Sequence, residues 1–303
     1  MLSMAHQFYA MASDCAVHLW GETAKHLELI AAGAEAEVGR IEARYSRYRS
    51  ESELSRINKI AATGGVIEID AETVGLITYA KACFAKSDGV FDITSGLLRG
   101  VWDFSASRLP DQSSIDALLP FIGFDKVALI NGQLRFDQPH MELDFGGLGK
   151  EYAADRAAEV CLELGARYGF VDLGGDIRAI GPQPDGLPWR IGIRHPREAD
   201  KLVAEIALSN GALATSGDYE RFIEVGGRRY CHILDPRTGW PAQGLSSVTV
   251  ISDRCLVAGS LSTAAMLKGR GGAAWLQELA VRHIVIDEEG NFYGTELPLT
   301  RFG

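Results

Sequence analysis

Residues His232 to Gly239 combine a titratable side chain with a stiff turn. The segment reads HILDPRTG, and an imidazole with an unperturbed pKa of about 6.5 gains or loses a proton near neutral pH. Pro236 restricts its own φ to about −65°, and Gly239 can adopt a positive φ without a Cβ clash. The pattern is typical of a tight turn. It fits a purely structural turn as well as one that holds a reactive histidine.

The residues before this turn favour a ligand-binding role. Between Ala214 and Ala242, a small hydroxyl loop and a hairpin with Gly226-Gly227 at its tip precede the DPRTG turn, within alternating apolar residues. Small loops at strand ends commonly hold ligands because a rigid scaffold positions them. The run therefore predicts a ligand site formed by these loops.

A glycine-rich segment predicts a place where the main chain approaches a phosphate. The sequence MELDFGGLGKEYAAD indicates a strand at Met141 to Phe145, then the turn Gly146 to Gly149, then a helix over about 150–164. Glycines permit close approach of the backbone, and a helix N-terminus offers unpaired N–H groups and the positive end of its dipole. The spacing matches neither GxGxxG nor a Walker motif, so close helix packing is the alternative.

Composition places the chain among ordinary globular proteins. Its 303 residues, 47% hydrophobic and 23% charged, suffice for one large domain or two fused lobes. The net charge of −10 and pI of about 5.2 argue against a nucleic-acid partner, which needs clustered Lys and Arg. A small anionic ligand is compatible, because backbone N–H groups and a metal bind it locally. The five cysteines are scattered, which predicts reduced, mostly buried thiols.

The N-terminal residues do not resemble a secretion signal. MLSMAHQFYAMASDC has neither a basic stretch nor an unbroken apolar stretch, and no later segment reaches the roughly 18 apolar residues of a membrane span. We therefore expect a cytoplasmic protein without stable membrane insertion, or a periplasmic one if an N-terminal signal has been removed from the chain.

Hydrophobic periodicity predicts the elements that position these loops. Apolar residues recur every three or four positions over about 22–45, the period of an amphipathic helix. Asn131-Gly132 predicts a type I′ hairpin, and 45–59 reads as a solvated connector with a short helix from Ser52 as the alternative. Further helices are predicted at about 71–87, 111–119, 256–267 and 273–279, and strands at about 66–69, 189–193, 202–208, 212–215, 247–251, 283–286 and 291–293. Helices that alternate with hairpins fit a mixed-sheet α+β or α/β fold.

Taken together and in this order, the motifs resemble those of the FAD:protein FMN transferases, the ApbE-type flavin transferases. The resemblance implies one ApbE-like domain over 1–303, either undivided or made of two closely packed lobes, with an α+β fold of mixed sheets and packed helices. Eight motifs carry it in register: FYAMAS, YSRYRSESELSRIN, GVFDITSGLLRGVW, ELDFGGLGKEYAAD, FVDLGGDIRAIG, ATSGDYERF, HILDPRTGWPA and VAGSLSTAAMLKG.

The resemblance implies a reaction. Such an enzyme binds FAD, uses Mg²⁺ to cleave the diphosphate, and attaches FMN to a Thr or Ser hydroxyl of an acceptor protein, with release of AMP. That chemistry needs a cation on the diphosphate and a base within reach of the hydroxyl. Two other interpretations stay open: a catalytically weakened FAD-binding module, and an Mg²⁺-dependent FAD diphosphatase that gives FMN and AMP.

The resemblance also implies roles for particular residues. His232 corresponds to the catalytic histidine that takes the proton of the acceptor hydroxyl. Met11 corresponds to a methionine whose thioether packs on the isoalloxazine ring, Tyr48 to an aromatic residue of the flavin pocket, and Asp155 to an acid that contacts the nucleotide. The cofactor-binding residues implied in this way are Met11, Tyr48, Gly147, Lys150, Asp155, Thr215, Ser216, Gly217, Asp235 and Thr238.

The implied metal site departs from the family pattern. Thr263 and the Gly147 carbonyl correspond to Mg²⁺ ligands, but Gly259 in AGSLST stands where the family usually has the aspartate of ADALST. Mg²⁺ prefers at least one carboxylate beside substrate phosphates. Asp176, Glu151 or another acid would then compensate. On this interpretation, Gly259→Asp tightens Mg²⁺ binding and raises turnover.

Overall fold

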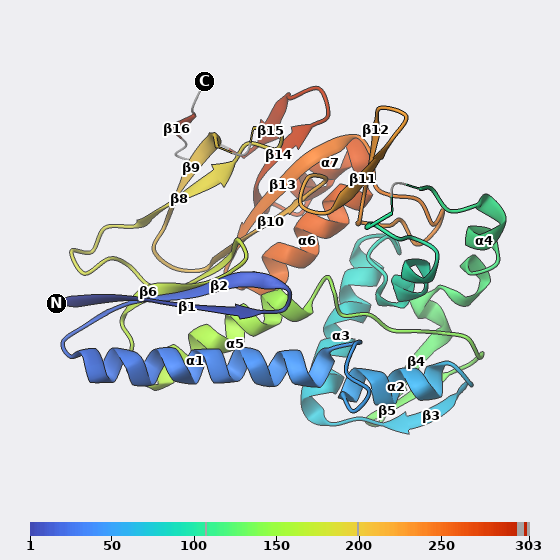
Figure 1. Ribbon diagram of the computed structural model, residues 1–303, viewed down its shortest axis with the longest axis horizontal. Helices are drawn as coiled ribbons and strands as arrows, with labels where there is room; N and C mark the ends of the chain where they lie inside the picture. The colour runs from blue at the N-terminus through green and yellow to red at the C-terminus, as the bar shows by residue number, and fades with distance from the viewer. Residues whose placement is uncertain (107, 199, 296–299, 302–303) are drawn as a thin grey trace.

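An eight-stranded sheet forms the centre of the computed structural model, which describes residues 1–106, 108–198, 200–295 and 300–301 (Figure 1). The strand order is β1-β2-β6-β7-β10-β13-β14-β15, and each neighbouring pair is antiparallel. The strands are β1 (Leu2–Ala10), β2 (Ser13–Gly21), β6 (Tyr168–Leu173), β7 (Asp176–Gly181), β10 (Ala212–Gly217), β13 (Leu245–Ser252), β14 (Arg282–Asp287) and β15 (Phe292–Gly294). Some neighbouring strands are joined by tight hairpins and others by long connections, so the sheet contains strands from both ends of the chain.

Three helices pack against one face of this sheet. They are α1 (Ala24–Tyr45), α5 (Gly149–Glu163) and α6 (Cys255–Leu267), and α5 contacts both of the others (Figure 1). The apolar stripe predicted for α1 is buried: Leu27, Ile30, Ala31, Ala34, Val38, Ile41 and Tyr45. Helix α6 consists mostly of small or apolar residues and is largely buried, because it lies against α5 as well as β10 and β13. Helix α7 (Gly272–Glu278) follows after the short η4 (Gly269–Gly271).

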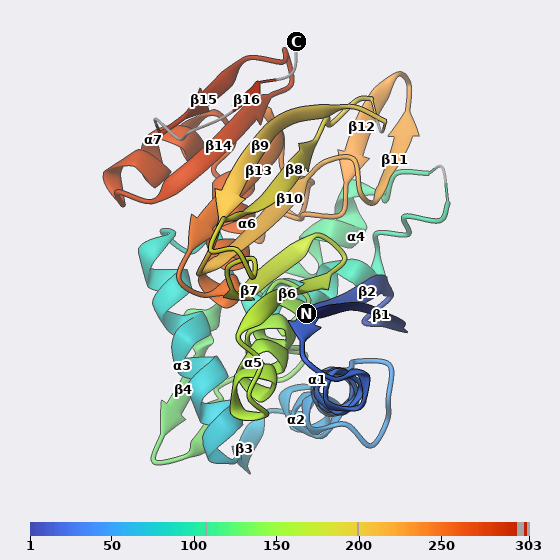
Figure 2. The same cartoon turned by 90° about the vertical axis from the view of Figure 1, so that its left-hand side faces the viewer.

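A small sheet packs on the opposite face. It contains β8 (Trp189–Arg194), β9 (Leu202–Leu208) and β16 (Thr300–Arg301), and Figure 2 shows β8 and β9 beside β10 and β13. Side chains alternate across a strand. Accordingly, Leu213 and Ile251 join the core under this small sheet, whereas Ala214 and Val250 join the core under the helices.

Most of the remaining elements form a group beside the C-terminal end of α1 (Figures 1 and 2). Helices α2 and α3 and the sheet β3-β5-β4 form most of this group, and the hairpin of β11 and β12 stands apart from it. The bounds are α2 (Glu53–Ala61), β3 (Gly65–Glu68), α3 (Ala71–Lys86), η1 (Ile93–Gly100), α4 (Gln112–Asp116), η2 (Leu119–Phe121), η3 (Phe124–Lys126), β4 (Val127–Ile130), β5 (Gln133–Phe136), β11 (Phe222–Val225) and β12 (Arg228–Cys231). Asn131 and Gly132 join β4 to β5 with φ of 50° and 79°, as a type I′ turn requires.

The predicted α+β class and long helices are confirmed, and two local expectations are wrong. The short helix from Ser52 exists as α2, so 45–59 is not simply a connector. Residues 141–145 do not form a strand. Their backbone groups pair outside any sheet: Asn58 exchanges hydrogen bonds with Leu143 N–H and C=O, and Asp144 N–H donates to the Ile93 carbonyl. The N-terminal hairpin β1–β2 was not predicted.

Two further expectations concern thiols and membranes. All five cysteines are free thiols; Cys83 is half-buried and the others are buried. Within the part of the chain that the structure describes, no helix combines the length and apolar character needed to cross a bilayer.

Candidate functional site

His232 follows β12 directly and is held by the chain opposite it. Its backbone N–H donates to the Arg221 carbonyl at 2.9 Å, and its Nδ1 lies 3.1 Å from the same oxygen. A carbonyl can only accept, so Nδ1 carries the proton of the neutral ring and Nε2 is the unprotonated nitrogen. His232 therefore presents Nε2 as a proton acceptor.

The surroundings keep His232 neutral. Burial lowers its pKa to about 4, the positive charges of Arg99, Arg221 and Lys150 act in the same direction, and the hydrogen bond with the Arg221 carbonyl opposes them. The imidazole is uncharged at neutral pH for this reason, which is the state that a general base needs. The same cations favour an anionic ligand beside the ring.

The turn after His232 is shaped by its own polar side chains. Asp235 Oδ1 accepts the Arg237 N–H at 2.9 Å, and Thr238 Oγ1 accepts the Trp240 N–H at 3.2 Å. Gly239 has a φ of 71°, and a Cβ there would lie 2.3 Å from the Ile115 side chain. Asp235 and Thr238 thus stabilise the turn, and their contact with a cofactor stays a prediction.

The glycine turn leads into α5 next to a guanidinium group. Gly149 N–H donates to the Phe145 carbonyl at 2.7 Å, and Gly146 N–H donates to Asp144 Oδ1 at 2.8 Å. A Cβ on Gly146 would lie 2.7 Å from an Arg99 nitrogen, so glycine permits the approach of Arg99. The N-terminus of α5 and the Arg99 charge together favour an anion at this turn.

Lys150 supplies a second positive charge at the start of α5. Its Nζ lies 2.9 Å from Asp176 Oδ2. Burial is the largest influence and opposes the charge on Lys150, but the nearby acids Asp176 and Glu151 and the hydrogen bond with Asp176 together outweigh it and raise the Lys150 pKa. Burial raises the pKa of Asp176, and Lys150 opposes that rise. Lys150 is therefore a fixed cation close enough to influence His232.

The end of β10 meets α6 through hydroxyl groups. Ser216 Oγ lies 2.7 Å from Ser262 Oγ and 3.0 Å from Thr263 Oγ1. Thr215 Oγ1 pairs with Thr249 Oγ1 at 2.8 Å on the neighbouring strand. The absence of a Cβ at Gly217 lets the Tyr219 ring pack against it, because a Cβ would lie 2.4 Å from that ring. The structure thus brings the predicted residues Ser216 and Thr263 together.

Helices α5 and α6 meet at the position where the family usually has an aspartate. A Cβ on Gly259 would lie 2.4 Å from Cγ of Glu151 and 2.6 Å from its Oε1. Burial raises the pKa of Glu151 to about 8, the nearby Asp176 adds to the rise, and Lys150 opposes it. Glu151, one of the acids expected to compensate for the missing aspartate, therefore lies next to Gly259 in space.

Two of the predicted flavin contacts, Met11 and Tyr48, lie at a hairpin tip and on the protein surface. Met11 is at the tip of the β1–β2 hairpin with a φ of 52°, and its N–H donates to Glu42 Oε1 at 2.7 Å. Tyr48 is 81% exposed, and the Arg47 guanidinium lies 5.9 Å from its ring centroid. Their contact with an isoalloxazine ring stays a prediction.

Asp155 holds the N-terminus of α6. Its two carboxylate oxygens accept the Cys255 and Leu256 N–H groups at 2.9 and 3.0 Å, and Arg178 Nε lies 3.1 Å from Oδ1. The side chain of the N-cap residue Arg254 does not cap α6, so Asp155 caps the helix from another element. In the structure this residue therefore has a structural role, and its contact with the nucleotide stays a prediction.

Replacing Asp155 with alanine should lower the free energy of unfolding by about 3 kcal/mol, because it leaves two helix N–H groups and a guanidinium without their buried partner. Urea unfolding measures this change. The matched control is Asp185→Ala, which removes an exposed aspartate that accepts the Leu187 N–H, with an expected change of about 0.5 kcal/mol or less. A folded variant of normal stability that binds FAD weakly would instead indicate a nucleotide contact.

A charged network beside the glycine turn was not predicted from the sequence. Arg47 lies 2.8 Å from Glu142 and 3.0 Å from Asp144, and Arg99 lies 2.8 Å from Asp144. The only sequence signal for it is that these residues belong to three of the eight motifs. Through Asp144, whose Oδ1 also accepts the Gly146 N–H, the network connects the glycine turn to Arg99 of η1 and to Arg47 after α1.

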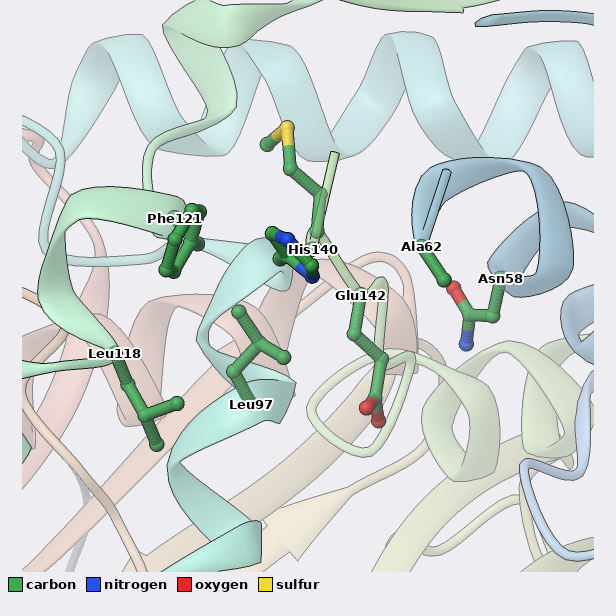
Figure 3. A pocket seen from close by; sticks show the side chains of 8 residues that line it. Asn58, Ala62, Leu97, Leu118, Phe121, His140 and Glu142 are labelled. Atoms are coloured by element: carbon green, nitrogen blue, oxygen red, sulfur yellow. The ribbon is translucent and has the colours of Figure 1, made fainter. Parts of the chain in front are cut away.

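A cavity of about 480 Å³ adjoins this network through Glu142 (Figure 3). Figure 3 shows Phe121, His140 and Leu97 on one side of it and Asn58 of α2 on the other. Its lining is Asn58, Ala62, Leu97, Leu118, Phe121, His140, Met141 and Glu142. None of the predicted cofactor-binding residues lines this cavity, so it was not anticipated.

The fold and this site define a member of a known family. The family model described as "ApbE family" matches residues 11–285. The chain belongs to the ApbE family.

Curated and solved relatives agree with this assignment. The chain is 32% identical to a protein named FAD:protein FMN transferase from Haemophilus influenzae, over 84% of this chain and 78% of that protein. It is 34% identical to the protein of the same name from Salmonella typhimurium, over 81% and 73%. The crystal structure of the ApbE protein from Thermotoga maritima superposes with a TM-score of 0.90, at 32% identity and 97% coverage of both chains. The flavinyl transferase ApbE of Pseudomonas stutzeri gives 0.85, at 30% identity and coverage of 99% and 94%.

Proposed function

We propose that this protein transfers FMN from FAD to a Thr or Ser hydroxyl of an acceptor protein, releases AMP and uses Mg²⁺. The observation that carries the proposal is the neutral His232, whose Nε2 is unprotonated and whose pKa is influenced by Arg99 and Lys150 beside the glycine turn. The names of the curated relatives support the same reaction.

In the proposed reaction, the acceptor oxygen forms a bond to the FMN phosphorus, and the bond from that phosphorus to the bridging oxygen breaks. AMP leaves with the bridging oxygen. The proton of the acceptor hydroxyl goes to His232 Nε2, and the imidazolium then loses it to water. Arg99, Lys150 and the first N–H groups of α5 stabilise the charge on the diphosphate. Thr263, the Gly147 carbonyl and one carboxylate would hold Mg²⁺, which when bound would neutralise further charge on the diphosphate.

A labelling experiment tests this function. The protein is incubated with FAD, Mg²⁺ and a flavoprotein acceptor that bears an exposed Thr, and the same acceptor with that Thr replaced by Val is the control. Covalent flavin on the Thr acceptor alone, detected by in-gel fluorescence and by mass, supports the proposal. Free FMN and AMP without labelling would indicate a diphosphatase. Bound, intact FAD after washing would indicate a binding module.

The rate of transfer should depend on pH according to the lowered pKa of His232. The imidazole is the active base when it is neutral, so activity is lost as the pH falls through its pKa of about 4 and is retained through 6.5. We expect kcat/KM for FAD at saturating Mg²⁺ to be flat between about pH 8 and 5.5. Circular dichroism at each pH checks that the protein stays folded. A decrease centred on pH 6.5 would mean that His232 is not shielded as the structure indicates.

A further inference from the structure

Glu151 is a buried carboxylate with one oxygen that has no partner. The residue lies in the first turn of α5 and is 7% exposed, and its Oε2 makes no hydrogen bond within the described structure. A buried, unpaired carboxylate oxygen is costly unless a cation or a donor satisfies it. The neighbouring acid Asp176 differs in this respect, because Lys150 Nζ lies 2.9 Å from its Oδ2.

The Glu151 side chain fills the space that a carboxylate on α6 would need. Any side chain at 259 would begin with a Cβ 2.4 Å from Cγ and 2.8 Å from Cδ of Glu151, which is closer than atoms of two side chains can approach. Residue 259 and Glu151 therefore compete for one volume. Thr263 stands one helical turn after Gly259, so the same face of α6 carries a hydroxyl that is suited to a hard cation.

We propose that Glu151 supplies, from α5, the carboxylate ligand of the divalent cation in place of an aspartate on α6. The donor set is Glu151 Oε2, Thr263 Oγ1 and the Gly147 carbonyl, completed by oxygens of the nucleotide diphosphate. The inference rests on the proposed function for the identity of that nucleotide. Mg²⁺ typically binds in this way, through one or two carboxylates and substrate phosphates.

This inference replaces the expectation that Gly259→Asp improves Mg²⁺ binding. In the chain as it stands, an aspartate at 259 would collide with Glu151 and place two carboxylates in one buried volume. We expect the single variant to lower the Tm by several degrees and to bind cations no more tightly. The double variant Glu151→Gly with Gly259→Asp removes the collision and returns one carboxylate to the site from α6.

Cation binding tests the proposal without reference to turnover. Mn²⁺ is titrated into the protein in the presence of ADP, and the EPR signal of the unbound ion measures affinity. Glu151→Gln keeps the shape of the side chain and should weaken Mn²⁺ binding at least about tenfold. Glu163→Gln, at an exposed position on the same helix, should leave the affinity unchanged. The double variant should bind within about threefold of the wild type, against the loss of at least about tenfold in Glu151→Gln.

Several results would overturn the proposal. They are an equal Mn²⁺ affinity of wild type and Glu151→Gln, no Mn²⁺ binding by the wild type, or a folded double variant that fails to recover. Flavin transfer is measured separately. A wild-type protein that binds Mn²⁺ through Glu151 yet labels no acceptor would contradict the proposed function and leave this inference intact.

Discussion

Replacing His232 with alanine should reduce the rate of FMN transfer by roughly 10²–10⁴-fold, the range that a positioned general base contributes. The structure explains the size of the effect. Arg221 fixes the tautomer through Nδ1, and burial with three nearby cations keeps Nε2 unprotonated at neutral pH. Without this nitrogen, water must accept the hydroxyl proton. FAD affinity should change little, because the anion-binding groups of Lys150, Arg99 and the α5 N-terminus remain.

Two measurements separate chemistry from binding in this variant. Flavin fluorescence quenching gives the FAD dissociation constant, and single-turnover labelling of the acceptor gives the rate of transfer. The control is His26→Ala, which removes an exposed imidazole that bonds the Leu164 carbonyl at the far end of α5. That control should transfer at the wild-type rate. Wild-type labelling by His232→Ala would exclude His232 from the mechanism.

The sequence predicted those parts of the fold that depend on local periodicity. The stripe of α1 and the Asn131-Gly132 hairpin follow from spacing and turn chemistry alone, and both are present. Residues 141–145 show the limit of this reasoning. Their alternation is typical of a strand, but Asn58 provides the hydrogen bonds that a neighbouring strand would otherwise supply. A tertiary partner of this kind is invisible to a local pattern.

The candidate site, too, was predicted only in part: the sequence indicated individual motifs but not the contacts between distant residues. The motif order indicated His232, the glycine turn and Thr263. In the structure, Arg99 approaches Gly146 of the glycine turn and its charge lowers the pKa of His232, and Thr263 Oγ1 lies 3.0 Å from Ser216 Oγ. The close approach of the Glu151 side chain to Gly259 was not predictable, because the two residues lie on different helices and far apart in the sequence. For Asp155, the motif match predicted a nucleotide contact and gave no indication that its carboxylate caps α6.

Replacing Lys150 with methionine should lower the free energy of unfolding by about 3 kcal/mol. The substitution keeps much of the side-chain volume and removes the charge 2.9 Å from Asp176, a residue that is 4% exposed. Asp176 would then be buried beside Glu151 without a counter-ion, and an uncompensated buried charge is the costly case. We expect a loss of stability at the low end of the range for a broken buried ion pair, because the Lys150 side chain is itself 29% exposed.

Urea unfolding of a double-mutant cycle tests this explanation. Adding Asp176→Asn to Lys150→Met removes the unpaired charge, so the double variant should regain at least half of the lost stability. Lys201→Met serves as the matched control, because Lys201 pairs with Glu198 at 2.6 Å on the exposed surface and should contribute about 0.5 kcal/mol or less. Additive losses in the cycle would show that the two residues act independently. In that case the stability that Lys150 provides would not come from its ion pair with Asp176.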